Sequence, residues 1–196
     1  PLPAVLHARK QGSLGVLNPD LFPWVVANCI GSTSYGFVRD DLFLVFSNIG
    51  GIYLGLLYLL SAYRLTSSPQ VAGRLETQTL ALALVFGGLD VGALRMTDRA
   101  VREAMIVLPT VVVTLCMYAS PLTTMMHVVR ERDSASINRA FLAMQLANCL
   151  MWFTYGLFTD DLAVAVANVC GLALGLAQAA LICRYPRAPA ALDGLK

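Results

Sequence analysis

Long apolar segments alternate with short polar turns along the chain. Six segments are long enough to cross about 30 Å of hydrocarbon at about 1.5 Å per residue, and they cover residues 21–38, 42–63, 77–94, 104–129, 140–158 and 162–183. They lack the alternation of apolar and polar residues over about ten positions that is typical of membrane β-strands. The pattern therefore predicts an all-α membrane protein.

The second half of the chain repeats the first. The stretch NCIGSTSYGFVRDDLFLVFSN at residues 28–48 returns as NCLMWFTYGLFTDDLAVAVAN at residues 148–168, at a constant offset of 120 residues. Such a repeat predicts two parallel three-helix bundles related by an axis along the membrane normal. An odd number of spans in each copy requires one more span between them to keep both copies in the same orientation. The segment 77–94 supplies this linker helix.

The repeat also predicts the domain limits. We expect a first three-helix copy in residues 1–64, the linker helix and its loops in 65–103, a second copy in 104–185, and a disordered cytosolic tail in 186–196. Pro1 aligns with Pro121, which follows most of the helix that opens the second copy. We therefore expect the first helix of the first copy to lie upstream of residue 1, so that an intact protein has seven spans and this chain has six.

Composition supports a membrane location. Apolar residues make up 57% of the chain and charged residues 13%, with a mean hydropathy of +0.66, which is outside the range of ordinary soluble domains. The net charge of +2 and the absence of a basic run with interleaved aromatics argue against a nucleic-acid partner. The five cysteines lie within apolar segments without metal-ligand spacing, so we expect neither a metal nor another cofactor.

Basic residues are distributed unequally between the two sides of the predicted spans. One side carries only Arg39, Arg95, Arg99 and Arg102. The other side carries Arg9, Lys10, Arg64, Arg74, Arg130, Arg132, Arg139, Arg184, Arg187 and Lys196. The positive-inside rule places the second side, and with it the C-terminal end, in the cytosol. We expect an integral protein of the plasma membrane.

Several motifs resemble those of the SWEET sugar facilitators. They are SPL at residues 120–122, WFTYG at 152–156, DDL at 160–162 and N..G..LG at 168–175, echoed by YG...DDL and N..G..LG within residues 35–55. The resemblance implies seven helices, in two three-helix bundles and a linker helix. It also implies passive, bidirectional carriage of mono- or disaccharides without ion coupling.

Two symmetry-related asparagines, Asn48 and Asn168, match the paired substrate asparagines of that family. A carboxamide has two donor hydrogens and two acceptor lone pairs, which suits vicinal sugar hydroxyls. A single membrane asparagine more often bonds a neighbouring helix. Two such residues facing one axis favour a substrate site instead.

We predict that further residues form the wall of this site. Trp152 can place its indole face against the C–H face of a pyranose, and the first copy has Ser32 where the resemblance leads one to expect a second aromatic. One helical turn away lie Asn28, Cys29, Asn148 and Cys149, the cysteines being equally compatible with simple packing.

The resemblance implies a gate at the outer ends of the helices and hinges at the inner ends. The gate residues are Tyr35, Arg39, Tyr155 and Asp161, of which Asp161 is also placed to cap a helix. Three of the family's four hinge prolines match Pro1, Pro19 and Pro121, and Arg139 replaces the fourth. Asp90, an acidic residue within the linker span, has no repeat partner, and a structural role is the simpler interpretation.

These observations predict a passive sugar uniporter that works by alternating access. Its partners would be a small sugar and the lipid bilayer, with homo-oligomers possible. One alternative is an amino-acid carrier of the PQ-loop type, although the repeats begin with Pro-Leu rather than Pro-Gln. The other is a non-transporting membrane receptor of the same architecture. An enzyme is not expected, because no Ser/His, His/Glu or paired-Asp arrangement lies within the spans.

Overall fold

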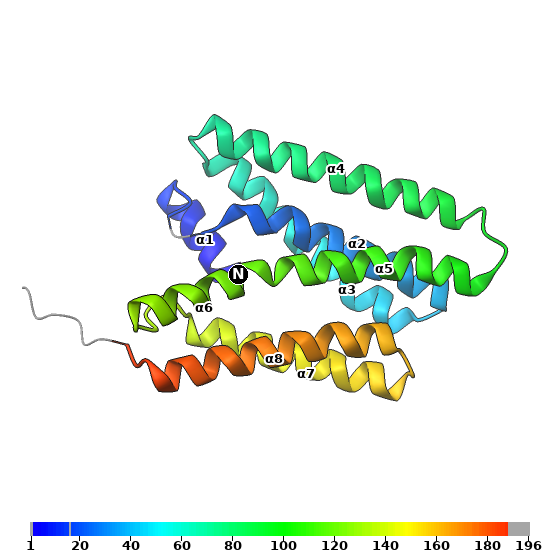
Figure 1. Ribbon diagram of the computed structural model, residues 1–196. Helices are drawn as coiled ribbons and strands as arrows, with labels where there is room; N and C mark the ends of the chain where they lie inside the picture. Colours follow the sequence, from blue (N-terminus) through cyan, green and yellow to red (C-terminus); the bar gives the residue numbers. More distant parts are fainter. Residues whose placement is uncertain (1, 16, 188–196) are drawn as a thin grey trace, which may run out of the picture. The chain divides into compact units, whose positions relative to one another are not determined.

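The computed structural model describes residues 2–15 and 17–187, and the regular elements in that part of the chain are helices (Figure 1). The chain divides by its contacts into two compact units, Pro1–Met117 and Tyr118–Lys196. Unit 1 holds α1 (Leu2–Gln11), the 3-10 helix η1 (Pro19–Leu21), α2 (Phe22–Arg39), α3 (Leu42–Leu65), α4 (Pro69–Ala93) and α5 (Arg99–Met117). Unit 2 holds α6 (Ala119–Glu131), α7 (Arg139–Phe158) and α8 (Leu162–Arg184). The predicted all-α class is confirmed.

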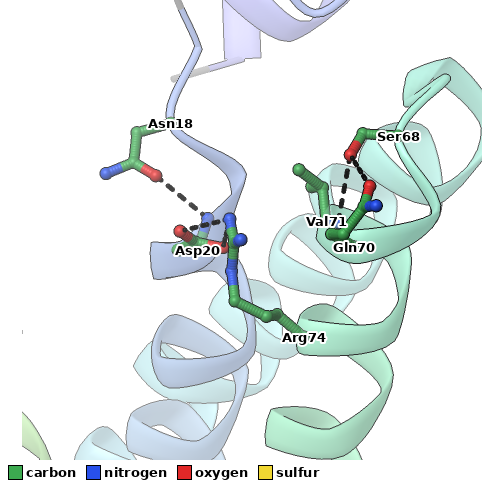
Figure 2. Close-up of polar contacts among 6 residues, drawn as sticks. All are labelled: Asn18, Asp20, Ser68, Gln70, Val71 and Arg74. Atoms are coloured by element: carbon green, nitrogen blue, oxygen red, sulfur yellow. Dashed lines mark hydrogen bonds and ion pairs between the residues drawn. The ribbon is translucent and has the colours of Figure 1, made fainter.

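All six predicted spans are helical, and the differences at their ends have local causes. α4 begins at Pro69 rather than at residue 77, because Ser68 Oγ caps it by accepting a hydrogen bond from the Val71 N–H at 3.4 Å (Figure 2). The predicted span 104–129 is divided between α5 and α6. Pro121 has no N–H to donate to the carbonyl of Met117, four residues earlier, and α5 ends at that residue.

Four helical segments of the described chain are long and apolar enough to cross a membrane, judged by length and composition. They are α3, the segment Arg99–Glu131 formed by α5 and α6, α7 and α8. α2 and α4 are less apolar because each carries polar side chains along part of its length. Large outward-facing hydrophobic residues such as Leu84 (77% exposed) and Phe158 (85% exposed) suit contact with lipid tails.

The sequence repeat appears in the structure as a repeated helical hairpin, α2–α3 in unit 1 and α7–α8 in unit 2. Glycines on the second helix of each hairpin lie against the first helix at equivalent positions: Gly51 and Gly55 contact Cys29 and Val26, while Gly171 and Gly175 contact Cys149 and Leu146. A Cβ atom at Gly51 or at Gly171 would lie 2.6 Å from the facing cysteine sulfur. These small residues therefore let the helices approach closely, which is how helices associate in lipid.

The turns of the two hairpins are equivalent as well. Asp40 and Asp160 adopt left-handed backbone conformations, with φ of 61° and 51°. The next aspartates cap the following helices: Asp41 Oδ1 accepts from the Leu44 N–H at 3.0 Å, and Asp161 Oδ1 accepts from the Val164 N–H at 3.1 Å. The capping role considered for Asp161 is thus confirmed.

α1 corresponds to α6 at the same offset of 120 residues. α1 ends at Gln11 and is followed by Gly12 with a φ of 71°, while α6 ends at Glu131 and is followed by Arg132 with a φ of 54°. A left-handed residue just after the last helical residue is a common way to end a helix. Both segments therefore end in the same conformation.

Unit 1 is held together by α2, which contacts α3, α4 and α5. Thr110 of α5 and Phe86 of α4 occupy the space beside Gly31 of α2, and Arg74 of α4 forms an ion pair of 3.2 Å with Asp20 of η1 (Figure 2). The contacts thus place α5 in unit 1, although the repeat assigns residues 104–117 to the second copy. The domain limits drawn from the repeat stay a prediction, and most of the predicted tail, residues 188–196, lies outside the described residues.

Candidate functional site

Asn48 of α3 and Asn168 of α8 share the same degree of burial and the same hydrogen bond. Each side chain is half-buried, and each Nδ2 donates at 2.8 Å to a carbonyl one turn earlier in its own helix, that of Leu44 or Val164. Neither side chain makes a hydrogen bond to another helix in residues 2–15 and 17–187. Each carboxamide therefore keeps one N–H and its oxygen available for a ligand, and the alternative of bonds between helices has no support there.

Asn28 and Asn148 are equivalent in sequence but differ in the structure. Asn28 Nδ2 donates to Thr114 Oγ1 of α5 at 2.6 Å, so this side chain joins two helices of unit 1. Asn148, on α7, is exposed. A polar side chain on an apolar span faces either another helix or a water-filled cavity. Asn28 faces another helix, α5. A role in binding substrate stays a prediction for Asn28 and for Asn148.

Cys29 and Cys149 lie at the contacts within the two hairpins, against Gly51 and Gly171. The cysteine in unit 2 has an additional neighbour, Tyr118, whose ring also packs against Gly171 and whose hydroxyl donates to the carbonyl of Ala167 at 3.0 Å. This geometry gives both cysteines a packing role. Contact with substrate is not required to explain their positions.

Thr114 and Tyr118 were not selected from the sequence, although both touch the candidate site. Thr114 holds Asn28, and Tyr118 bonds the residue next to Asn168. The available signals were a hydroxyl in an apolar span and a tyrosine two residues before the SPL motif. Neither signal identifies the hydrogen-bond partner of the residue, because the partner depends on which helices pack together.

Trp152 and Tyr155 form an aromatic pair on α7, with ring centroids 5.6 Å apart and planes at 84°. Both side chains are half-buried, as is Ser32, which corresponds to Trp152 in α2. The edge-to-face arrangement holds the indole against the Tyr155 ring, about one helical turn along α7. Unit 1 has only a hydroxymethyl group at the matching place.

The predicted gate residues lie near the end of α2 in unit 1 and around the turn between α7 and α8 in unit 2. In unit 1, Tyr35 is 4% exposed, its hydroxyl lies 3.2 Å from Arg39 Nη1, and the guanidinium lies 5.8 Å from the ring centroid. In unit 2, Asp161 is 3% exposed and caps α8 near Tyr155 in sequence. Tyr35 and Arg39 thus contact each other within α2, and Asp161 has a capping role in unit 2. A gate that joins them stays a prediction.

The predicted hinge residues lie at helix starts. Pro19 opens η1 after the cap Asn18, and Arg139 opens α7 after the cap Asn138, so the two junctions are equivalent. Pro121 is the third residue of α6, just beyond the break between α5 and α6. Pro1 lies outside the described residues.

The remaining acidic candidate, Asp90, is half-buried on α4. No cluster of three or more His, Cys, Asp or Glu side chains that could hold a metal ion occurs among residues 2–15 and 17–187. The candidate site is therefore composed of neutral amides, hydroxyls and aromatic rings, which can bind a neutral polyol by hydrogen bonds and stacking.

The chain is similar to several known proteins. Residues 105–190 match a family described as "Sugar efflux transporter for intercellular exchange". The sugar transporter SWEET1 of Drosophila pseudoobscura pseudoobscura is 30% identical over 155 residues, which cover 78% of this chain and 67% of that protein. The bidirectional sugar transporter SWEET15 of Oryza sativa subsp. indica is 29% identical over 192 residues, covering 94% of this chain and 58% of that protein.

The fold is also similar to a solved one. The structure of a eukaryotic SWEET transporter superposes with a TM-score of 0.81 at 22% identity and covers 94% of this chain and 87% of that one. Together with the apolar helices, these similarities identify an integral membrane protein.

Proposed function

Since the chain belongs to the SWEET family, we propose that it is a sugar transporter that carries mono- or disaccharides passively and in both directions by alternating access. The names of its relatives, a sugar transporter and a bidirectional sugar transporter, support this proposal. We further propose that it acts in the plasma membrane with its C-terminal end in the cytosol, in keeping with the distribution of Lys and Arg.

The observation that carries the proposal is the matched pair Asn48 and Asn168. Both bond only their own helix among the described residues and are half-buried, so each keeps an N–H and an oxygen free. A sugar has hydroxyls that donate and accept hydrogen bonds. These hydroxyls could take the place of water molecules at the carboxamide of each asparagine. We propose that the pair contacts the substrate, with Trp152 stacking on one sugar face.

Passive carriage is supported by the charge pattern of the repeat. α3 and α8 contain no acidic residue, so no symmetry-related carboxylate is placed to bind a proton at mid-helix depth. A carrier must also release its substrate. A dissociation constant near 1 mM corresponds to about −4 kcal/mol, which a few hydrogen bonds and one stacked ring can supply.

The test is uptake of radiolabelled glucose and sucrose by transporter-deficient cells that express the full-length protein. We expect saturable uptake of at least one of the two, at a rate that depends on surface-localised protein. Radiolabelled neutral amino acids provide the comparison, because their uptake would favour a carrier of the PQ-loop type. If the chain reaches the surface and moves none of these solutes, the transporter proposal fails and a receptor becomes the better account.

A further inference from the structure

A cavity of about 440 Å³ lies where the C-terminal ends of α1 and α3 meet in unit 1, lined by Arg9, Gly12, Arg64 and Leu65. Arg9 Nη1 lies 3.5 Å from Ser61 Oγ, and Ser61 is itself 4% exposed. The hydroxyl of Ser61 donates to the Leu57 carbonyl, which fixes it in the wall of α3. One arginine is thus oriented by a buried hydroxyl and the second faces the same cavity.

The charge of this cavity is not neutralised. No carboxylate in residues 2–15 and 17–187 lies within ion-pair distance of Arg9 or Arg64, whereas Arg74 and Arg99 each have an acidic partner. Lys10 is exposed beside Arg9. Two guanidinium groups around one cavity favour an anion that can accept paired hydrogen bonds, such as a phosphate.

An exposed apolar stripe on α3 begins directly below Arg64. Leu60 (65% exposed), Leu56 (38%) and Tyr53 (71%) follow it at spacings of four, four and three residues, so they share one face of the helix. Arg9 and Arg64 belong to the side of the protein that the positive-inside rule assigns to the cytosol. The cavity therefore lies at the end of a surface that suits lipid tails.

We propose that this cavity binds the phosphate-bearing headgroup of an anionic phospholipid from the cytosolic leaflet, with an acyl chain along the stripe of α3. Basic pockets between helices at the cytosolic surface have the right chemistry for such headgroups. The site is separate from the proposed sugar site, and its test does not depend on transport. Arginines at helix ends also interact with the helix dipole, a role that needs no ligand.

The experiment measures binding to the purified full chain in a neutral detergent. Short-chain phosphatidylglycerol, short-chain phosphatidylcholine and inorganic phosphate are titrated separately, and thermal unfolding gives an apparent dissociation constant for each. The test variant is Arg9→Gln/Arg64→Gln. The matched control is Arg132→Gln/Arg184→Gln, which removes two basic residues from the same predicted side, and Arg9→Lys/Arg64→Lys restores charge in the cavity.

We expect phosphatidylglycerol to bind the wild-type chain and the control with equal affinity, and to bind the Gln variant at least about tenfold more weakly. The Lys variant should recover part of this loss, and a cooperative thermal unfolding transition of the Gln variant itself should show that it folds. Equal affinity of the Gln variant and the control would overturn the proposal. It would also be overturned if phosphatidylcholine bound as well as phosphatidylglycerol, or if phosphate alone bound and the lipid did not.

Discussion

At the scale of single residues, the asparagine pair gives the clearest expectation. Asn168→Ala should lower sugar flux per surface-localised molecule by at least about tenfold, and Asn48→Ala should do the same. The reason is that sugar hydroxyls left unpaired in a largely dehydrated site cost about 1–3 kcal/mol, and about 1.4 kcal/mol already corresponds to tenfold. Stability should change little, because each Nδ2 bonds only its own helix in the described part of the chain.

The measurement compares flux per molecule with the melting temperature of the same variants. Gly175→Leu serves as the control for a packing defect, because a Cβ there would lie 2.6 Å from Leu146 Cδ2. That variant should lose folded protein, whereas the asparagine variants should keep it. Normal flux per molecule in both asparagine variants would remove the substrate role proposed for the pair.

The sequence revealed these asparagines but not their neighbours. The repeat pairs Asn28 with Asn148 and predicts equal roles, yet Thr114 bonds only the first of them. Thr114 is 86 residues from Asn28 along the chain, and no periodicity connects the two. The pairing arises from the packing of α5 against α2, which is a tertiary event that local pattern does not record.

At the scale of helices, two adjacent glycines of α3 provide a matched comparison. Gly51→Ala should destabilise the protein by about 1–3 kcal/mol, because the added Cβ would lie 2.6 Å from Cys29 Sγ in a close helix contact. A Cβ added at Gly50 would have no other atom within 4 Å. Gly50→Ala should therefore be neutral or stabilising by up to about 1 kcal/mol, as helix propensity predicts.

Thermal unfolding in detergent tests this difference, and Cys29→Ala supplies the double-mutant cycle. Removing the sulfur should restore much of the stability lost in Gly51→Ala, because it makes room for the new methyl group. Equal melting temperatures for Gly50→Ala and Gly51→Ala would show that α2 and α3 do not meet at this contact.

Helix positions were largely predictable, because lipid demands long apolar segments and internal hydrogen bonding of the backbone. The residues at which helices end were less predictable. The break before α6 depends on Pro121, whose missing N–H leaves the Met117 carbonyl without its helical donor. Hydropathy does not detect that loss, since the residues on both sides of the break are apolar enough to continue the span.

At the scale of the whole molecule, passive transport predicts that sugar equilibrates and does not accumulate. In cells that express the full-length protein, a non-metabolisable glucose analogue should reach equal concentrations inside and outside. A protonophore should leave both the rate and the final level unchanged, because the repeated helices α3 and α8 carry no carboxylate. Accumulation above the external level that collapses with the protonophore would demonstrate coupling, and Asp90 would be the first residue to replace.

The copies of the repeat and the compact units of the molecule do not coincide. The repeat is a relation between sequences, whereas the compact units are defined by contacts. By sequence, α5 belongs with the second copy of the repeat. By its contacts it belongs with unit 1, because Thr110 fills the space beside Gly31. A helix that follows a duplicated pattern can still pack against a different neighbour.

The two hairpins carry one sequence pattern twice within a single chain, so each position can be compared with its equivalent. Positions that pack or cap, such as Gly51/Gly171 and Asp41/Asp161, have stayed the same. An exposed position differs between the copies, with Phe46 in the first and Val166 in the second. Ser32 and Trp152 also differ, although both are half-buried. At this position of the repeat only unit 2 offers an indole face on which a sugar ring could stack, so the two units would contribute unequally to the proposed binding of a sugar.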